Sequence, residues 1–234
     1  MHNETANIWS HLLGALYILV KLFNFMHGRA LTVHATDAIA VALFFLSCVA
    51  CFLMSASYHC LSDHSPGINR LGNQLDHLGI VVIFWGASTS ACHFVFASRD
   101  TLKATYILVL SVSAAVCGWF TLQPMFRTPR FRSARALTYS LLGLSMAIPF
   151  VHVLLEMELE ELDEKMELSS FLGMILLVFL GGLMYAVRVP ERWFPGTFDV
   201  LGQSHNWLHV LVLAAALLRL DGLLDLLANK NYAL

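Results

Sequence analysis

The chain has 234 residues, of which 58% are hydrophobic and 13% are charged, and its formal net charge is −2. A typical soluble domain is about 25% charged and 45–50% apolar, so the composition excludes an ordinary soluble domain and predicts a membrane protein with several spans. The small net charge gives no reason to expect a nucleic-acid partner.

Seven apolar stretches follow one another along the chain. A bilayer core about 30 Å thick needs roughly 20 apolar residues in a helix, and each stretch meets that length. In chain order they cover approximately residues 7–26, 37–60, 75–97, 104–122, 136–155, 169–188 and 204–224. Pro66 and Gly67 predict a loop between the second and third stretches. We therefore predict an all-α fold, a seven-transmembrane helix bundle that forms one domain over residues 1–234.

The charges between the stretches predict how the bundle is oriented. With seven spans, the second, fourth and sixth loops share a side with the N-terminus; their bases are Arg70, Arg127, Arg130, Arg132, Arg135, Arg188 and Arg192. The bases expected on the other side are Arg29, Arg99, Lys103, Lys165, Arg219 and Lys230. Cytoplasmic loops are the ones richer in Lys and Arg. We expect a cytoplasmic N-terminus and an outside C-terminus, in the plasma membrane or an endomembrane.

Three pairs of polar residues lie at the ends of these stretches. Ser55 and His59 end the second stretch, Asp76 and His77 start the third, and His205 and His209 start the seventh. With seven spans, all three pairs fall at the membrane face of the N-terminus. Residues four apart share one face of a helix. Ionisable groups near lipid are costly, so their presence indicates a functional site.

The residue types in these pairs suit one metal ion. A catalytic zinc has three protein ligands and one open position for water, and we predict His59, His205 and His209 as those ligands. The H-x-x-x-H at residues 205–209 lacks the glutamate of the H-E-x-x-H metalloproteases. Asp76 is therefore the candidate general base, and Ser55 is a candidate hydrogen-bond donor to the water or to an oxyanion.

The residues that open the first stretch have two readings. Glu4, Asn7, Ser10 and His11 are of types that favour helix starts. They are equally suited to form hydrogen bonds with the zinc ligands on the side away from the metal, and His11 could even replace one ligand. His77 points about 100° away from Asp76 around a helix, so we expect it to face substrate or a neighbouring helix.

Four motifs resemble the progestin and adipoQ receptor family, also called haemolysin III-related. They are residues 3–12 (NETANIWSHL), 55–59 (SASYH), 75–80 (LDHLGI) and 204–209 (SHNWLH). The resemblance covers almost the whole chain. It implies a seven-helix fold with a cytoplasmic N-terminus and an intramembrane zinc held by His59, His205 and His209, with Asp76 and Ser55 in the family's aspartate and serine positions. This chain departs from the family at His77, where tyrosine is common, and at Asn206, where glutamine is common.

The resemblance also bears on activity. Adiponectin receptors are linked to ceramide hydrolysis, alkaline ceramidases share the plan of the site, fungal members are tied to zinc and lipid homeostasis, and bacterial members are called haemolysins. Our leading hypothesis is a zinc-dependent hydrolase of a membrane lipid amide such as ceramide. The alternatives are a receptor with a structural zinc, which would have a protein ligand or a cytoplasmic partner, and a haemolysin-type channel or zinc transporter. A hydrolase needs a lipid-sized cavity that touches the metal.

Overall fold

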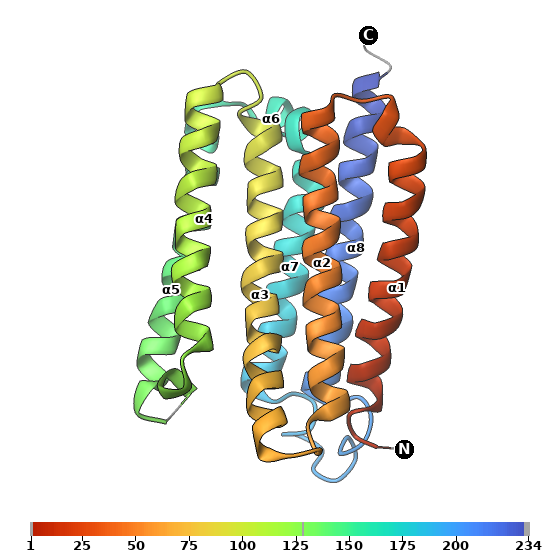
Figure 1. The fold of residues 1–234 in the computed structure, drawn as a ribbon, viewed down its shortest axis with the longest axis vertical. Coiled ribbons are helices and arrows are strands. Elements are labelled where there is room, and N and C mark those ends of the chain that lie inside the picture. Colours follow the sequence, from red (N-terminus) through yellow and green to blue (C-terminus); the bar gives the residue numbers. More distant parts are fainter. Residues whose placement is uncertain (1, 128, 232–234) are drawn as a thin grey trace.

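The computed structural model describes residues 2–127 and 129–231, and over these residues the chain is helical without strands (Figure 1). Short 3₁₀ turns lie at Arg29–Leu31, Pro124–Arg127 and Pro129–Phe131. The α-helices in this part of the chain are α1 (Thr5–His27), α2 (Ala35–Leu61), α3 (Pro66–Val95), α4 (Asp100–Leu122), α5 (Arg132–Glu156), α6 (Leu159–Met166), α7 (Leu168–Val187) and α8 (Ser204–Asn231).

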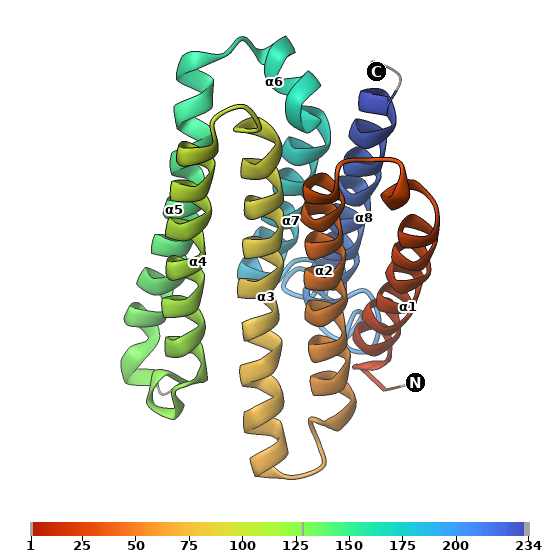
Figure 2. The same cartoon turned by 45° about the horizontal axis from the view of Figure 1, so that its top comes forward.

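The long helices run side by side and alternate in direction, and the short α6 lies at the end of the bundle opposite the N-terminus (Figure 1). The two termini lie at opposite ends. The strongest packing joins α2 to α3, α7 to α8, and α1 to α2. The hairpin of α4 and α5 packs on α3, at the side of the bundle away from α1 (Figure 2). The alternation brings the end of α2 and the starts of α3 and α8 to the end of the bundle that holds the N-terminus.

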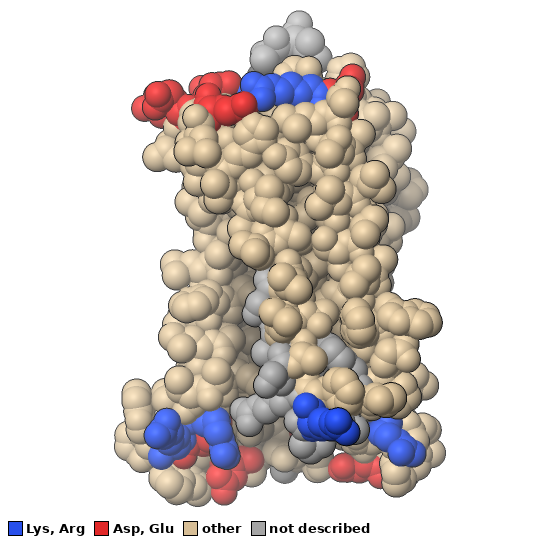
Figure 3. All heavy atoms as spheres, turned by 90° about the vertical axis from the view of Figure 1, so that its left-hand side faces the viewer, with Lys and Arg blue, Asp and Glu red and all other residues tan. Residues whose placement is uncertain are grey.

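The surface of the bundle is that of a membrane protein. Within the described ranges, five helices are long and apolar enough to cross a bilayer, namely α1, α2, α3, α4 and α7, and α5 contains a shorter apolar stretch, Leu141–Glu156. On the face formed by α4 and α5, the visible charged side chains gather at the two ends of the molecule (Figure 3). The count of seven spans and the cytoplasmic N-terminus remain predictions. The side chains of Arg127, Arg132 and Arg135 lie outside the described residues.

The start of α3 differs from the sequence prediction. The helix begins at Pro66, so Pro66 and Gly67 open it instead of marking a loop. Ser65 caps it by accepting a hydrogen bond from the backbone N–H of Ile68 at 3.4 Å, and proline suits the first helical position because that N–H needs no partner within the helix. Asp76 therefore lies about three turns inside α3 instead of at its start. The apolar stretch marked only the part of α3 from residue 75 onward, and the helix continues for nine more polar and apolar residues before it.

Arg219 is a second correction, because the sequence prediction counted it among the bases exposed on the side opposite the N-terminus. Its side chain is fully buried inside the bundle. The guanidinium donates to the carbonyl of Met166 at 2.6 Å and to the hydroxyl of Ser170 at 2.9 Å. Met166 is the last residue of α6, and Ser170 lies in the first turn of α7. Arg219 lies in α8, so its hydrogen bonds connect α8 to the junction between α6 and α7. Composition gives the number of charged residues, but it does not show which of their side chains are buried.

Two glycines allow helix backbones to approach closely. At Gly181 in α7, an added Cβ would lie 3.3 Å from the Cβ of Leu211 in α8, as expected for a small residue at a helix–helix interface. At Gly79 in α3, an added Cβ would lie 3.0 Å from the Cα of Cys51 in α2. Backbone cannot rotate away as a side chain can, so Gly79 sets the spacing of α2 and α3 about one helical turn from Ser55 and Asp76, toward the middle of the bundle.

Gly79→Ala is expected to lower the stability of the protein in detergent by about 1–3 kcal/mol, the usual effect of overpacking a core. Gly143→Ala is the matched control, since its added Cβ meets nothing within 4 Å, and alanine in a helix is favoured over glycine by up to about 1 kcal/mol. Thermal unfolding of the two variants checks this. Equal melting temperatures would show that α2 and α3 can separate at no cost.

Candidate metal centre

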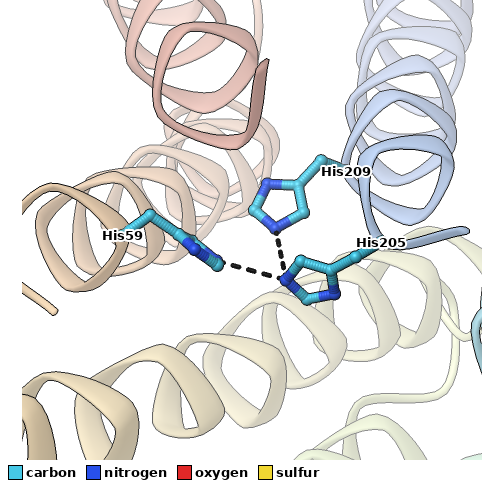
Figure 4. Close-up of side chains that lie close together, drawn as sticks. All are labelled: His59, His205 and His209. Carbon is cyan, nitrogen blue, oxygen red and sulfur yellow. Dashed lines mark hydrogen bonds between the residues drawn. The ribbon is translucent and has the colours of Figure 1, made fainter. Parts of the chain in front are cut away.

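Three histidines from two helices point at one another at the N-terminal end of the bundle (Figure 4). His59 lies in the last turn of α2, and His205 and His209 lie in the first turns of α8. The Nε2 atom of His205 is 3.4 Å from Nε2 of His59 and 3.3 Å from Nε2 of His209. One candidate ligand atom from each histidine lies within 4.8 Å of the others. The tertiary structure thus brings together the three side chains that the helix-end pattern singled out.

The distances and the chemistry of the cluster fit a tetrahedral metal ion. Two nitrogens that each lie 2.0–2.1 Å from zinc at a tetrahedral angle are about 3.3–3.4 Å apart. A neutral imidazole nitrogen carries either one proton or one lone pair. Nε2 of His205 therefore cannot form a good hydrogen bond with Nε2 of His59 and with Nε2 of His209 at the same time. A cation that accepts lone pairs from all three nitrogens would satisfy them together, and imidazole is a ligand that zinc favours.

Glu4 lies behind His59. The Nδ1 atom of His59 is 2.7 Å from Oε2 of Glu4, and the side-chain amide of Asn7 donates to the same oxygen at 2.7 Å. Glu4 is the residue at the N-cap of α1, but its side chain makes no capping hydrogen bond to that helix and contacts His59 instead. Burial acts to raise the pKa of Glu4, but the hydrogen bond from Asn7 and the charge and hydrogen bond of His59 outweigh it, and the pKa is lowered from 4.5.

Asn206 and Glu191 hold the start of α8, and the sequence pattern did not identify either role. Asn206 donates to the side-chain oxygen of Asn7 at 2.8 Å and accepts from the backbone N–H of Gly202 at 2.9 Å. Glu191 accepts from the backbone N–H of Ser204 at 2.8 Å and also from its hydroxyl. A carboxylate is favoured at a helix N-terminus. Asn206 lies 199 residues from Asn7, and Glu191 lies 13 residues from Ser204, so local spacing could not have indicated these two contacts.

A cavity of about 230 Å³ adjoins the cluster. Ser55, Asp76, His205 and His209 all line it, so the structure brings the candidate base and the candidate hydroxyl to the same space as two of the candidate metal ligands. The remaining wall is mostly apolar and reaches Phe44 in α2 and Ala216 in α8. Ala216 lies eleven residues after His205 along α8, which corresponds to about 16 Å. The cavity is therefore polar at one end and apolar along its length.

Two further histidines lie on the wall of this cavity but outside the cluster. His77 has its Nδ1 atom bonded to the backbone carbonyl of Asn73 at 2.8 Å. His11 is stacked on His209 with ring centroids 4.0 Å apart and planes tilted by 31°. Among the described residues, the side chains whose ligand atoms all lie within 4.8 Å of one another are His59, His205 and His209, and His11 is not one of them. The option that His11 replaces a ligand therefore has no geometric support.

Comparison with known proteins gives matches along nearly the whole chain. Residues 1–220 match the family described as haemolysin-III related. The chain is 34% identical over 226 residues to an adiponectin receptor protein of Drosophila melanogaster, covering 97% of this chain and 51% of that protein. It is also 34% identical over 229 residues to the ADIPOR-like receptor IZH2 of Saccharomyces cerevisiae, covering 96% and 72%.

A third relative is the progestin and adipoQ receptor-like protein 1 of Caenorhabditis elegans, which is 30% identical over 226 residues, covering 97% of this chain and 52% of that protein. The chain thus spans about half the length of the fly and nematode relatives.

Proposed function

This chain belongs to the haemolysin-III related family of membrane proteins, and we propose that it is a zinc-dependent hydrolase of a membrane lipid amide such as ceramide. One observation carries the proposal: the histidine cluster adjoins a cavity whose wall also holds a carboxylate and a hydroxyl, Asp76 and Ser55. A site with a purely structural metal has no need of such a cavity.

Each polar residue around the cavity has a different role in the proposed amide hydrolysis. Zinc held by His59, His205 and His209 would supply Lewis acidity, polarising the carbonyl and lowering the pKa of water to about 7. Asp76 takes a proton from the water that adds to the carbonyl carbon and gives it to the amide nitrogen as the C–N bond breaks. Ser55 donates a hydrogen bond to the carbonyl oxygen as negative charge develops there. The products are a fatty acid and an amine.

The apolar part of the cavity suits an acyl chain. Its length of about 16 Å along α8 is about half the thickness of a 30 Å hydrocarbon core. Small residues and flexible ones line its far end, including Ala87, Met174 and Ala216. An acyl chain held there would have its amide carbonyl at the polar end of the cavity, beside His205 and Asp76.

Turnover of a ceramide by the purified protein tests the proposal. We expect hydrolysis that stops when a strong chelator removes zinc and returns when zinc is restored. Protein that holds zinc and hydrolyses no lipid amide would contradict the proposal. That outcome would favour the second candidate function, a receptor with a structural metal, which the names of the fly and yeast relatives support.

A further inference from the structure

The segment before α1 makes a carboxylate contact to one metal-site histidine. Glu4 and His59 are 55 residues apart in the chain, and their side chains meet at 2.7 Å. The side chain of His59 is 4% exposed and that of Glu4 is 25% exposed, so the pair is mostly screened from water. A hydrogen bond in such surroundings holds its geometry better than one on an open surface.

The contact selects one form of His59. A carboxylate can only accept, so Nδ1 of His59 carries the proton, and Nε2 of the same ring keeps its lone pair. That lone pair is on the side of Nε2 of His205, 3.4 Å away. A carboxylate behind an imidazole also raises its basicity and so strengthens its bond to a metal.

Asn7 connects this pair to the other two histidines. Its amide nitrogen donates to Glu4 and its amide oxygen accepts from Asn206, which lies between His205 and His209 in α8. Asn7 has no exposed surface and Asn206 is 5% exposed, so water does not compete for these bonds. Helix α1 packs against both α2 and α8. The chain of bonds from His59 through Glu4 and Asn7 to Asn206 therefore fixes the ligand from α2 relative to the ligands from α8.

We propose that Glu4, held by Asn7, is a positioning residue that sets the tautomer and the orientation of His59 and thereby sets the affinity of the metal site. The inference rests on the proposed zinc site but not on hydrolysis. Glu4 does not contact the ion; it acts through His59.

Zinc affinity of the purified full chain tests this directly. The dissociation constant of Zn²⁺ is to be measured by competition with a chromophoric chelator. The proteins compared are the wild type, Glu4→Gln, Asn7→Ala and the control Glu160→Gln. The Glu160 carboxylate is exposed on α6, at the other end of the bundle. Loss of an outer partner of a zinc ligand costs 10–100-fold in metal affinity. We expect Glu4→Gln to weaken binding about 10–100-fold, Asn7→Ala to weaken it by a smaller factor, and Glu160→Gln to match the wild type.

A second readout separates positioning from a general loss of structure. The melting temperature without metal should be nearly unchanged in Glu4→Gln, while the rise in melting temperature on adding Zn²⁺ should shrink. Wild-type affinity in Glu4→Gln would overturn the inference and leave the proposed hydrolase standing. An equal fall in stability with and without Zn²⁺, at unchanged affinity, would assign Glu4 a structural role instead. Absence of zinc binding by the wild type would overturn both the inference and the proposed function.

Discussion

Replacing His205 by alanine is expected to abolish tight zinc binding. His205 is the central member of the cluster, since its Nε2 atom faces both other histidines at 3.4 and 3.3 Å. Its removal leaves two nitrogens where zinc prefers four ligands. Changes behind a ligand already cost 10–100-fold in affinity, so we expect the loss of the ligand itself to exceed about 100-fold. Zinc content after dialysis of the purified variant measures the effect.

The matched control for this variant is His64→Ala. His64 is an exposed histidine in the turn after α2, at the same end of the bundle. It should keep the zinc content of the wild type. Retention of one zinc per chain by His205→Ala would mean that the cluster is not the metal site, and the assignment of His59 and His209 would fall with it.

Replacing Asp76 by asparagine is expected to remove hydrolysis while zinc stays bound. Asp76 lines the cavity but is not one of the three clustered ligands. Asparagine has the same shape and cannot take a proton from water, and general-base catalysis contributes about 10²–10⁴-fold to rates. We therefore expect kcat to fall by about that factor, with zinc content unchanged and KM changed much less.

Asp63→Asn is the control for this second variant, because Asp63 is an exposed carboxylate in the turn between α2 and α3. It should leave both kcat and zinc content as they are. Hydrolysis by Asp76→Asn at the wild-type rate would show that another group moves the proton. Loss of zinc from Asp76→Asn would instead make Asp76 part of the metal coordination.

The histidines of the candidate metal site were predictable because their signal is local. A helix places residues four apart on one face, and a polar pair at the end of an apolar stretch is unusual enough to stand out. These two features single out His59, His205 and His209 without any knowledge of contacts. The membrane setting was predictable for the same reason, since it depends on composition and on the length of apolar runs.

Other features depend on which helices become neighbours. Glu4 contacts His59 across 55 residues, and Asn7 contacts Asn206 across 199. The sequence left Glu4 equally suited to capping α1 and to supporting a ligand. The burial of Arg219 likewise depends on α6 and α7 placing their carbonyls and the Ser170 hydroxyl within its reach.

The chain by itself determined the class of protein, the helical character of its apolar stretches and the identity of the candidate metal ligands, because hydropathy and helical period are properties of short segments. The tertiary structure alone decided that α3 extends back to Pro66, that Asp76 and Ser55 share a cavity with the histidines, and that Glu4 lies behind His59. Each of these is set by the packing of residues distant in sequence, and no property of a single segment specifies which partner it will meet.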